Sequence, residues 1–175
     1  MKNNKGFSLV ELIIVIAIMA ILVGVMAPQL IKYIEKSKVS SDTQLLDTWH
    51  TAIVTSMMDP AVLSEDDNSQ TQIDHFQSAG SSGVWLSSIG GDTAFCRSIL
   101  SIVGEPETAN LQAIANNMST QFRSKAAHAN GGIIVACEGS TIYMWIQHSD
   151  RTGAGEDNTC NNIADLESSG VIYVK

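Results

Sequence analysis

The side chains of this chain that could carry out catalysis or bind zinc are few and widely spaced. Its 4 histidines and 3 cysteines fall in none of the motifs typical of a hydrolase, a phosphate-binding loop or a zinc protease. A zinc site could be assembled only from Cys96, Cys137 and Cys160 with His128 or His148. That set lacks the C-x-x-C pair that zinc sites usually contain. We therefore expect neither an enzyme nor a zinc protein.

Acidic side chains near the C-terminus are a second candidate metal site. They are Asp150, Glu156, Asp157 and Asn158. Carboxylate oxygens suit calcium, but this spacing does not match that of an EF-hand loop. An acidic, solvated loop explains the same residues without a metal. We expect no metal and no cofactor.

A single acid at the start of a long apolar run is the most unusual feature of the sequence. Residues 12–27 carry no charge, and the 21 residues from Phe7 to Ala27 are interrupted only by Ser8 and Glu11. A helix of that length is about 30 Å long, enough to cross a bilayer's hydrocarbon core. A carboxylate inside hydrocarbon costs on the order of 3 kcal/mol. Glu11 therefore either lies at the membrane interface or pairs with a positive group inside a protein assembly.

The residues around this acid resemble a known processing signal. The hexapeptide GFSLVE at residues 6–11, with Pro28 at the far end of the apolar run, resembles the class III signal of type IV pilins and type II secretion pseudopilins, in a form like that of type IVa. The resemblance extends over residues 5–35, and Ser8 stands where many members have threonine. It implies that prepilin peptidase cuts between Gly6 and Phe7 and methylates the new amine, giving N-methylphenylalanine.

The resemblance also implies a role for Glu11 in assembly. Cleavage creates a charged amine on Phe7, and the helix dipole disfavours a cation at a helix N-terminus. A carboxylate from a neighbouring subunit can neutralise that amine, and in apolar surroundings the attraction is weakly screened. We therefore expect Glu11 of one subunit to pair with Phe7 of another. The implied partners are prepilin peptidase, other pilin subunits in a homopolymer, the pilus assembly platform and the cytoplasmic membrane.

Three functions are compatible with these residues. The first is a structural subunit of a type IV pilus, which is single-pass in the cytoplasmic membrane (N-in, C-out) before assembly and part of an extracellular filament at the cell surface afterwards. Such filaments serve adhesion, motility or DNA uptake. The second is a pseudopilin of a type II secretion or competence system. The third is a binding domain on a single membrane span that never polymerises.

The charge of the chain bears on its partners. The formal net charge is −8, and removing Lys2 and Lys5 with the leader leaves 8 basic against 18 acidic side chains. An acidic surface cannot neutralise the phosphates of a nucleic acid. We therefore expect no nucleic-acid binding by the soluble part.

The sequence predicts an α+β pilin fold built on one long N-terminal helix over residues 7–58, which Asp59 and Pro60 end. Gly24 and Pro28 are expected to be weak points of this helix, because proline removes a backbone hydrogen bond. Five segments are expected: a leader at 1–6, a transmembrane and polymerisation half at 7–27, an amphipathic half at 28–58, a connecting αβ-loop region with one or two helices at 59–132, and a β-sheet with a D-region-like loop at 133–175.

Shorter elements follow in the second half of the chain. A helix over 94–103 is predicted behind a cap at Asp92 or Thr93, and another helix over 105–127. Strands are predicted at 133–137 and 141–147, joined by a Glu-Gly-Ser hairpin, and at 171–174. Packing of this sheet on the long helix is expected to bury one core, which includes Trp49, Ile53, Ile134, Tyr143 and Trp145. Only one of the two strand aromatics, Tyr143 or Trp145, is expected to face the helix.

The 3 cysteines can form at most one disulfide within the chain. A Cys137–Cys160 bond would resemble the disulfide that bounds the D-region of many pilins, and an exported domain can keep it. Pairing of Cys96 with either of the other two, or no disulfide at all, remains an alternative. Cys96 lies on the apolar face of its predicted helix, so we expect a buried free thiol there.

Overall fold

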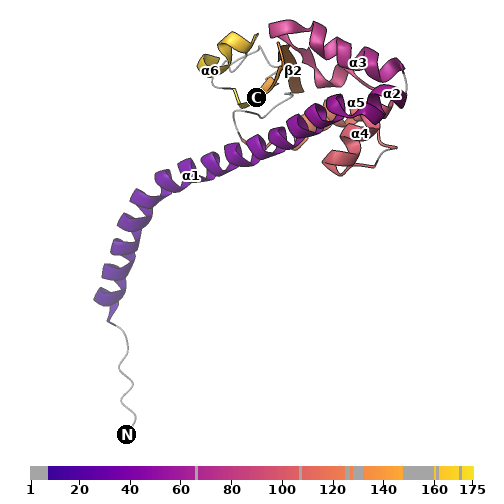
Figure 1. The fold of residues 1–175 in the computed structure, drawn as a ribbon. Helices are drawn as coiled ribbons and strands as arrows, with labels where there is room; N and C mark the ends of the chain where they lie inside the picture. The colour runs from indigo at the N-terminus through magenta and orange to yellow at the C-terminus, as the bar shows by residue number, and fades with distance from the viewer. Residues whose placement is uncertain are drawn as a thin grey trace. The chain divides into compact units, whose positions relative to one another are not determined.

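One long helix, α1 (Leu9–Met58), is the first element of the structure, a computed structural model. The structure describes residues 8–65, 67–106, 108–124, 127, 132–147, 160, 162–169 and 171–175. The chain divides into two units, Met1–Ser37 and Lys38–Lys175. The predicted α+β class is confirmed, because the chain combines this helix with a small antiparallel sheet and additional helices (Figure 1).

The first unit contains the apolar part of α1. Every large apolar side chain from Leu9 to Ile34 is exposed, by 48% to 73%. The helix is long and apolar enough to cross a membrane. None of the residues in its most apolar stretch of 18 is buried within the structure. Pro28 lies inside α1, and the helix continues through it. Local melting near Gly24 and Pro28 stays a prediction.

In the second unit, one side of α1 is buried. Its buried side chains recur every three or four residues, as helical geometry requires for a single face; they are Asp42, Leu46, Trp49, Ala52, Ile53 and Ser56. The apolar members of this row pack in the main core with side chains of the sheet and of the shorter helices. From Asp42 to Ser56, α1 therefore buries one face, while the predicted amphipathic half at 28–58 stays a prediction as a segment.

The sheet has four antiparallel strands in the order β1-β2-β3-β4. They are β1 (Val84–Trp85), β2 (Gly132–Glu138), β3 (Thr141–Gln147) and β4 (Tyr173–Val174). The predicted hairpin is confirmed: Glu138 pairs with Thr141, so Gly139 and Ser140 form the turn. Gly139 has φ +64, a left-handed conformation that glycine adopts without strain.

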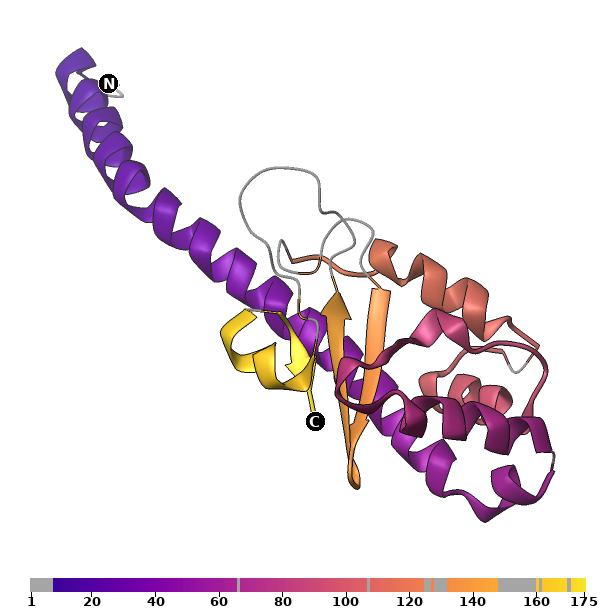
Figure 2. The same cartoon turned by 90° about the horizontal axis from the view of Figure 1, so that it is seen from above.

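The two faces of the sheet belong to different apolar clusters, so the prediction of one core is wrong. Successive side chains of a strand point to opposite faces. Ile133 and Val135 join Trp49 and Ile53 in the main core, whereas Ile134 and Trp145 face the other way. There they meet Cys160, Leu166 and Val171, with Tyr143 packed alongside. In Figure 2, α6 (Leu166–Ser169) and β4 lie on one side of the hairpin, and α2 to α5 on the other.

The helices of the connecting region agree only partly with the prediction. The helix predicted at 94–103 is confirmed as α4 (Ala94–Val103), with Thr93 as its N-cap and Gly104 as a left-handed C-cap. The helix predicted at 105–127 is much shorter, since α5 (Leu111–Asn117) begins behind Asn110 and ends in the short 3-10 helix η3 (Met118–Thr120).

Two further helices occur in the connecting region before α4, where the sequence predicts none. They are α2 (Pro60–Glu65) and α3 (Asp67–Ser78). Val62 of α2 and Ile73 and Phe76 of α3 are buried in the main core. The remaining short elements are the 3-10 helices η1 (Gly80–Ser82), η2 (Leu86–Ser88) and η4 (Ile163–Asp165).

Candidate functional site at the N-terminal processing and assembly segment

Glu11 caps the first turn of α1 through a hydrogen bond to the backbone. The backbone N–H of Ser8 donates a hydrogen bond of 2.8 Å to Oε2 of Glu11. This is the contact that the acid of a capping box makes, in which a Ser or Thr precedes a Glu by three residues. Glu11 thereby satisfies one of the N–H groups that every helix leaves unpaired at its start. It also places a negative charge at the positive end of the helix dipole.

The carboxylate of Glu11 keeps the capacity to bind a second group. An ionised carboxylate has two oxygens that can accept about four hydrogen bonds, and Ser8 uses one of these sites. The side chain is exposed. A cation that approaches the start of the helix could therefore bind Glu11 while the contact with Ser8 persists.

The predicted processing residues themselves lie outside the described part of the chain. Gly6 and Phe7 precede Ser8, where the description of the structure begins. What the structure adds is the contact between Ser8 and Glu11, which the sequence reasoning missed. The signal was present, because a Ser-x-x-Glu pattern directly before an apolar run is typical of a helix start. Ser8 stands where many members of the resembled family have threonine, and either hydroxyl residue suits that pattern.

The comparison with known families agrees with this reading of the N-terminus. Residues 1–27 match the family model described as "Prokaryotic N-terminal methylation motif". The predicted class III signal is thereby confirmed, and it is consistent with a type IV pilin or pseudopilin. The motif points to a structural subunit rather than an enzyme. No curated protein and no solved structure matches this chain.

The structure does not form the predicted Cys137–Cys160 disulfide. Cys96, Cys137 and Cys160 are all free thiols. Cys137 packs against the main core, while Cys160 is buried in the cluster on the opposite face of the sheet. The Cys160 Sγ–H instead donates to the carbonyl of Asn162 at 2.9 Å, and burial raises the pKa of the Cys137 thiol. The pairing stays a prediction, whereas the expected burial of Cys96 is confirmed.

The candidate metal ligands are not brought together in the part of the chain that the structure describes. Among those residues, no three His, Cys, Asp or Glu side chains lie close enough to hold an ion. The histidines of the zinc alternative, His128 and His148, lie outside the described residues, as do the acids of the calcium alternative at 150–158.

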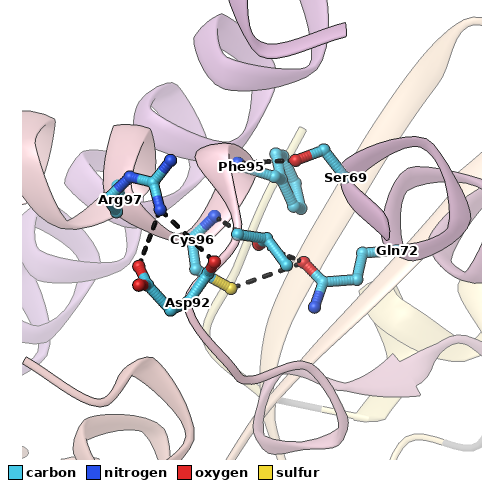
Figure 3. A network of polar contacts seen from close by, with 7 residues as sticks. Ser69, Gln72, Asp92, Phe95, Cys96 and Arg97 are labelled. Carbon is cyan, nitrogen blue, oxygen red and sulfur yellow. Dashed lines mark hydrogen bonds and ion pairs between the residues drawn. The ribbon is translucent and has the colours of Figure 1, made fainter. Parts of the chain in front are cut away.

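A polar network joins α3 to the start of α4 (Figure 3). Oε1 of Gln72 accepts hydrogen bonds from Thr93 Oγ1 at 2.8 Å and from Cys96 Sγ at 3.4 Å. Nε2 of the same amide donates to the carbonyl of Gly90 at 2.7 Å. The Thr93 hydroxyl also accepts from Cys96 N at 3.1 Å, which caps α4. The amide of Gln72 thus fixes the position of the helix start.

A cavity of about 620 Å³ lies beside this network. Asp92 and Arg97 on its wall form an ion pair of 2.7 Å, so these opposite charges neutralise each other. Cys96, also on its wall, is engaged by Gln72. Among the described residues of the network and the cavity wall we find no nucleophile with an adjacent base, and the hydrogen bonds explain the local structure.

A buried carboxylate attaches the chain after η3 to α1. Asp42 is 1% exposed. Its oxygens accept from Arg123 N at 2.9 Å and from Ser124 N at 2.8 Å, and the Ser124 hydroxyl donates to it as well. Three donors on one buried carboxylate explain how it can lie inside the protein, since a buried charge needs such partners. Sequence periodicity could not identify Asp42 as buried, because an acid within a helix is normally assigned to the exposed face.

Proposed function

We propose that this protein is a structural subunit of a type IV pilus. Prepilin peptidase cuts it between Gly6 and Phe7 and methylates the amine of Phe7. Before assembly the subunit lies in the cytoplasmic membrane as a single span, with its N-terminus inside and its globular part outside. The assembly platform then adds it to a homopolymer held together by the N-terminal helices, which becomes an extracellular filament.

The observation that carries this proposal is the methylation motif at residues 1–27 together with the apolar helix that begins within it at Leu9, whose large apolar side chains are exposed. Exposed apolar patches beyond a few hundred Å² mark surfaces that a membrane or a protein partner covers. A membrane can cover the side chains from Leu9 to Ile34 before assembly, and neighbouring helices can cover them afterwards. The proposal therefore accounts for the signal and for the uncovered surface together.

The geometry at the start of α1 supports the assembly role of Glu11. Its carboxylate is exposed and holds Ser8 N with one oxygen. The amine of Phe7, once methylated, remains a secondary amine and is protonated at neutral pH. We propose that this ammonium group of one subunit binds the Glu11 carboxylate of a neighbour and sets the axial register between helices.

A pseudopilin of a type II secretion or competence system is the alternative within the same family. It would carry the same signal and assemble through the same helix, but into a short fibre. Long filaments sheared from the cell surface would indicate a pilus. Protein that is processed and assembled but yields no long filaments would indicate a pseudopilus. A non-polymerising anchored domain would show neither filaments nor a methylated Phe7.

The first experiment is intact mass measurement with N-terminal peptide sequencing of the protein extracted from membranes of its host. We expect the chain to begin at Phe7 and to carry one added methyl group. A chain that begins at Met1 in a host with active prepilin peptidase would overturn the proposal. A Gly6→Ala variant, measured in parallel, tests whether cleavage needs the glycine.

The second experiment separates processing from assembly. We expect Glu11→Ala and Glu11→Gln both to be cut and methylated but to form no filaments, since neither keeps the charge. The glutamine variant retains an oxygen that can accept from Ser8 N, so it tests the charge apart from the helix cap. Glu35→Ala, which removes the other acid of the first unit, is the control and should assemble. Normal filaments from Glu11→Gln would refute the proposed ion pair.

A further inference from the structure

Two lysines and a tyrosine directly follow the apolar part of α1. Lys32, Tyr33 and Lys36 are all exposed. Lys32 is the first charged residue after Glu11, and the 20 residues between them carry no charge. That uncharged run is about 30 Å long, which matches the thickness of a bilayer's hydrocarbon core. Glu11 and Lys32 therefore mark the two ends of the part of the helix that fits into hydrocarbon.

The positions of the three side chains fit the layer of lipid headgroups. Lys32 and Lys36 are separated by one helical turn and share a face of α1, with Tyr33 next to them. They lie about 6 Å apart along the helix axis, which is close to the thickness of one headgroup layer. Tyrosine is enriched at this level of membranes, because its ring is apolar and its hydroxyl is polar.

The two lysines are also chemically available. Neither makes an ion pair or hydrogen bond with any residue that the structure describes, whereas Glu35 and Lys38 each take part in an interaction. Two like charges one turn apart repel each other. An anion that binds between the ammonium groups of Lys32 and Lys36 would relieve this repulsion.

We propose that Lys32, Tyr33 and Lys36 form a site for the headgroups of anionic phospholipids, which holds the subunit at a fixed depth in the bilayer before assembly. The proposal rests on the membrane-inserted stage of the proposed function. The acidic surface of a second copy is the rival occupant. It accounts for the charge of the lysines, but neither for their spacing from Glu11 nor for Tyr33, and so the lipid is favoured.

The test uses full-length protein in detergent micelles and native mass spectrometry. Phosphatidylglycerol and phosphatidylcholine with identical acyl chains are titrated in turn, and the dissociation constant of each is measured. We expect wild-type protein to prefer phosphatidylglycerol. Each lysine near an anionic headgroup contributes about fivefold in affinity, so a Lys32→Gln/Lys36→Gln double variant should bind it about 25-fold more weakly. Lys38→Gln, which removes the same charge from the same helix, should change the affinity less than about twofold.

Equal affinity of the wild type for the two lipids, or an unchanged preference in the double variant, would overturn the proposal. A double variant that keeps its lipid preference but no longer forms filaments would instead assign the lysines to contacts between subunits. The same spectra report the mature N-terminus. A methylated Phe7 without lipid preference refutes this site alone, whereas an uncut chain refutes the proposed function whatever the lipid result.

Discussion

Replacing Asp42 with alanine should destabilise the globular unit strongly. The carboxylate is 1% exposed and accepts hydrogen bonds from the N–H groups of Arg123 and Ser124 and from the Ser124 hydroxyl. Alanine removes all of these contacts at once. Ser124 is completely buried, so its N–H cannot turn to water, whereas Arg123 is exposed and can.

The expected loss follows from those contacts. Hydrogen bonds to a charged group contribute about 1.5–3 kcal/mol, and a buried donor without a partner costs about 1–3 kcal/mol. Because one of the two N–H groups can recover a bond to water, we expect Asp42→Ala to lower the free energy of unfolding by about 3 kcal/mol. Ser124→Ala removes only the hydroxyl bond and should cost about 1 kcal/mol.

Urea unfolding of the full-length protein in detergent measures this change. Trp49, which is buried two turns further along α1, provides the fluorescence signal. With a typical slope of about 2 kcal/mol per molar urea, the midpoint should fall by about 1.5 M. Asp47→Ala is the control, because Asp47 is an exposed acid on the same helix; its midpoint should stay within about 0.25 M.

An Asp42→Ala midpoint within the range of the Asp47→Ala control would refute the reasoning. It would mean that water reaches the Ser124 N–H, or that the contact with the segment after η3 adds no stability. A fall in the slope together with the midpoint would instead show that the segment after η3 is already detached in the folded state of the variant.

Three further predictions concern the helix cap and the cysteines. Thr93→Ala should lower the free energy of unfolding by about 1 kcal/mol, because α4 loses its N-cap, while Thr93→Ser should stay near wild type in the same urea assay. Burial raises the pKa of the Cys137 thiol; alkylation of Cys137 should therefore still accelerate at pH values where a freely exposed thiol has levelled off. The folded chain keeps that proton longer than the unfolded chain, so stability should fall as pH rises through the thiol range. Intact mass with and without reductant decides the state of the cysteines: three free thiols leave the mass unchanged, whereas reduction of a Cys137–Cys160 disulfide adds the mass of two hydrogens.

The long helix and the hairpin could be predicted because their signals are local. Gln29 to Met58 contains neither glycine nor proline, and Asp59-Pro60 provides a stop. The Glu-Gly-Ser turn lies between two runs rich in β-forming residues. In α4, Thr93 and Gly104 mark both ends by side-chain and backbone chemistry that does not depend on distant contacts. Each of these elements therefore follows from residues within or beside it.

Helix α3 could not be predicted because its stability comes from elsewhere in the chain. Ile73 and Phe76, both buried, are its only large apolar residues, and two are too few for a periodic signal. Its polar residues make the contacts instead: Ser69 Oγ accepts from Phe95 N at 3.0 Å, and Gln72 binds Thr93 and Gly90. In a sequence window, the same serines and glutamines look like those of a solvated loop. Tertiary contacts therefore decide the structure of this segment.

The faces of the sheet show a different limit of sequence reasoning. Alternation indicates correctly that Ile133 and Val135 share one face and Ile134 shares the other with Ala136. Both rows are apolar, so alternation alone cannot say which row meets α1. The expectation that Trp145 shares a core with Trp49 is wrong, because Trp145 packs against Cys160 and Leu166, which come from the end of the chain. That choice depends on segments far apart in the sequence.

The two units of the chain gain stability from apolar burial in different ways under the proposed function. The second unit buries its own core, whereas the apolar side chains of the first have no interior. Fully burying one such side chain contributes about 1.5–3 kcal/mol, so ten of them outweigh the net stability of a typical domain. Burial in a membrane stabilises these side chains about as much as burial among neighbouring helices does, because lipid tails are as apolar as leucine. Transfer from bilayer to filament therefore gains little from hydrophobic burial, and specific contacts must favour the filament. The proposed pair of Glu11 with the amine of Phe7 would be such a contact, since both charges would lie at the start of an apolar segment that otherwise gains as much from lipid as from protein.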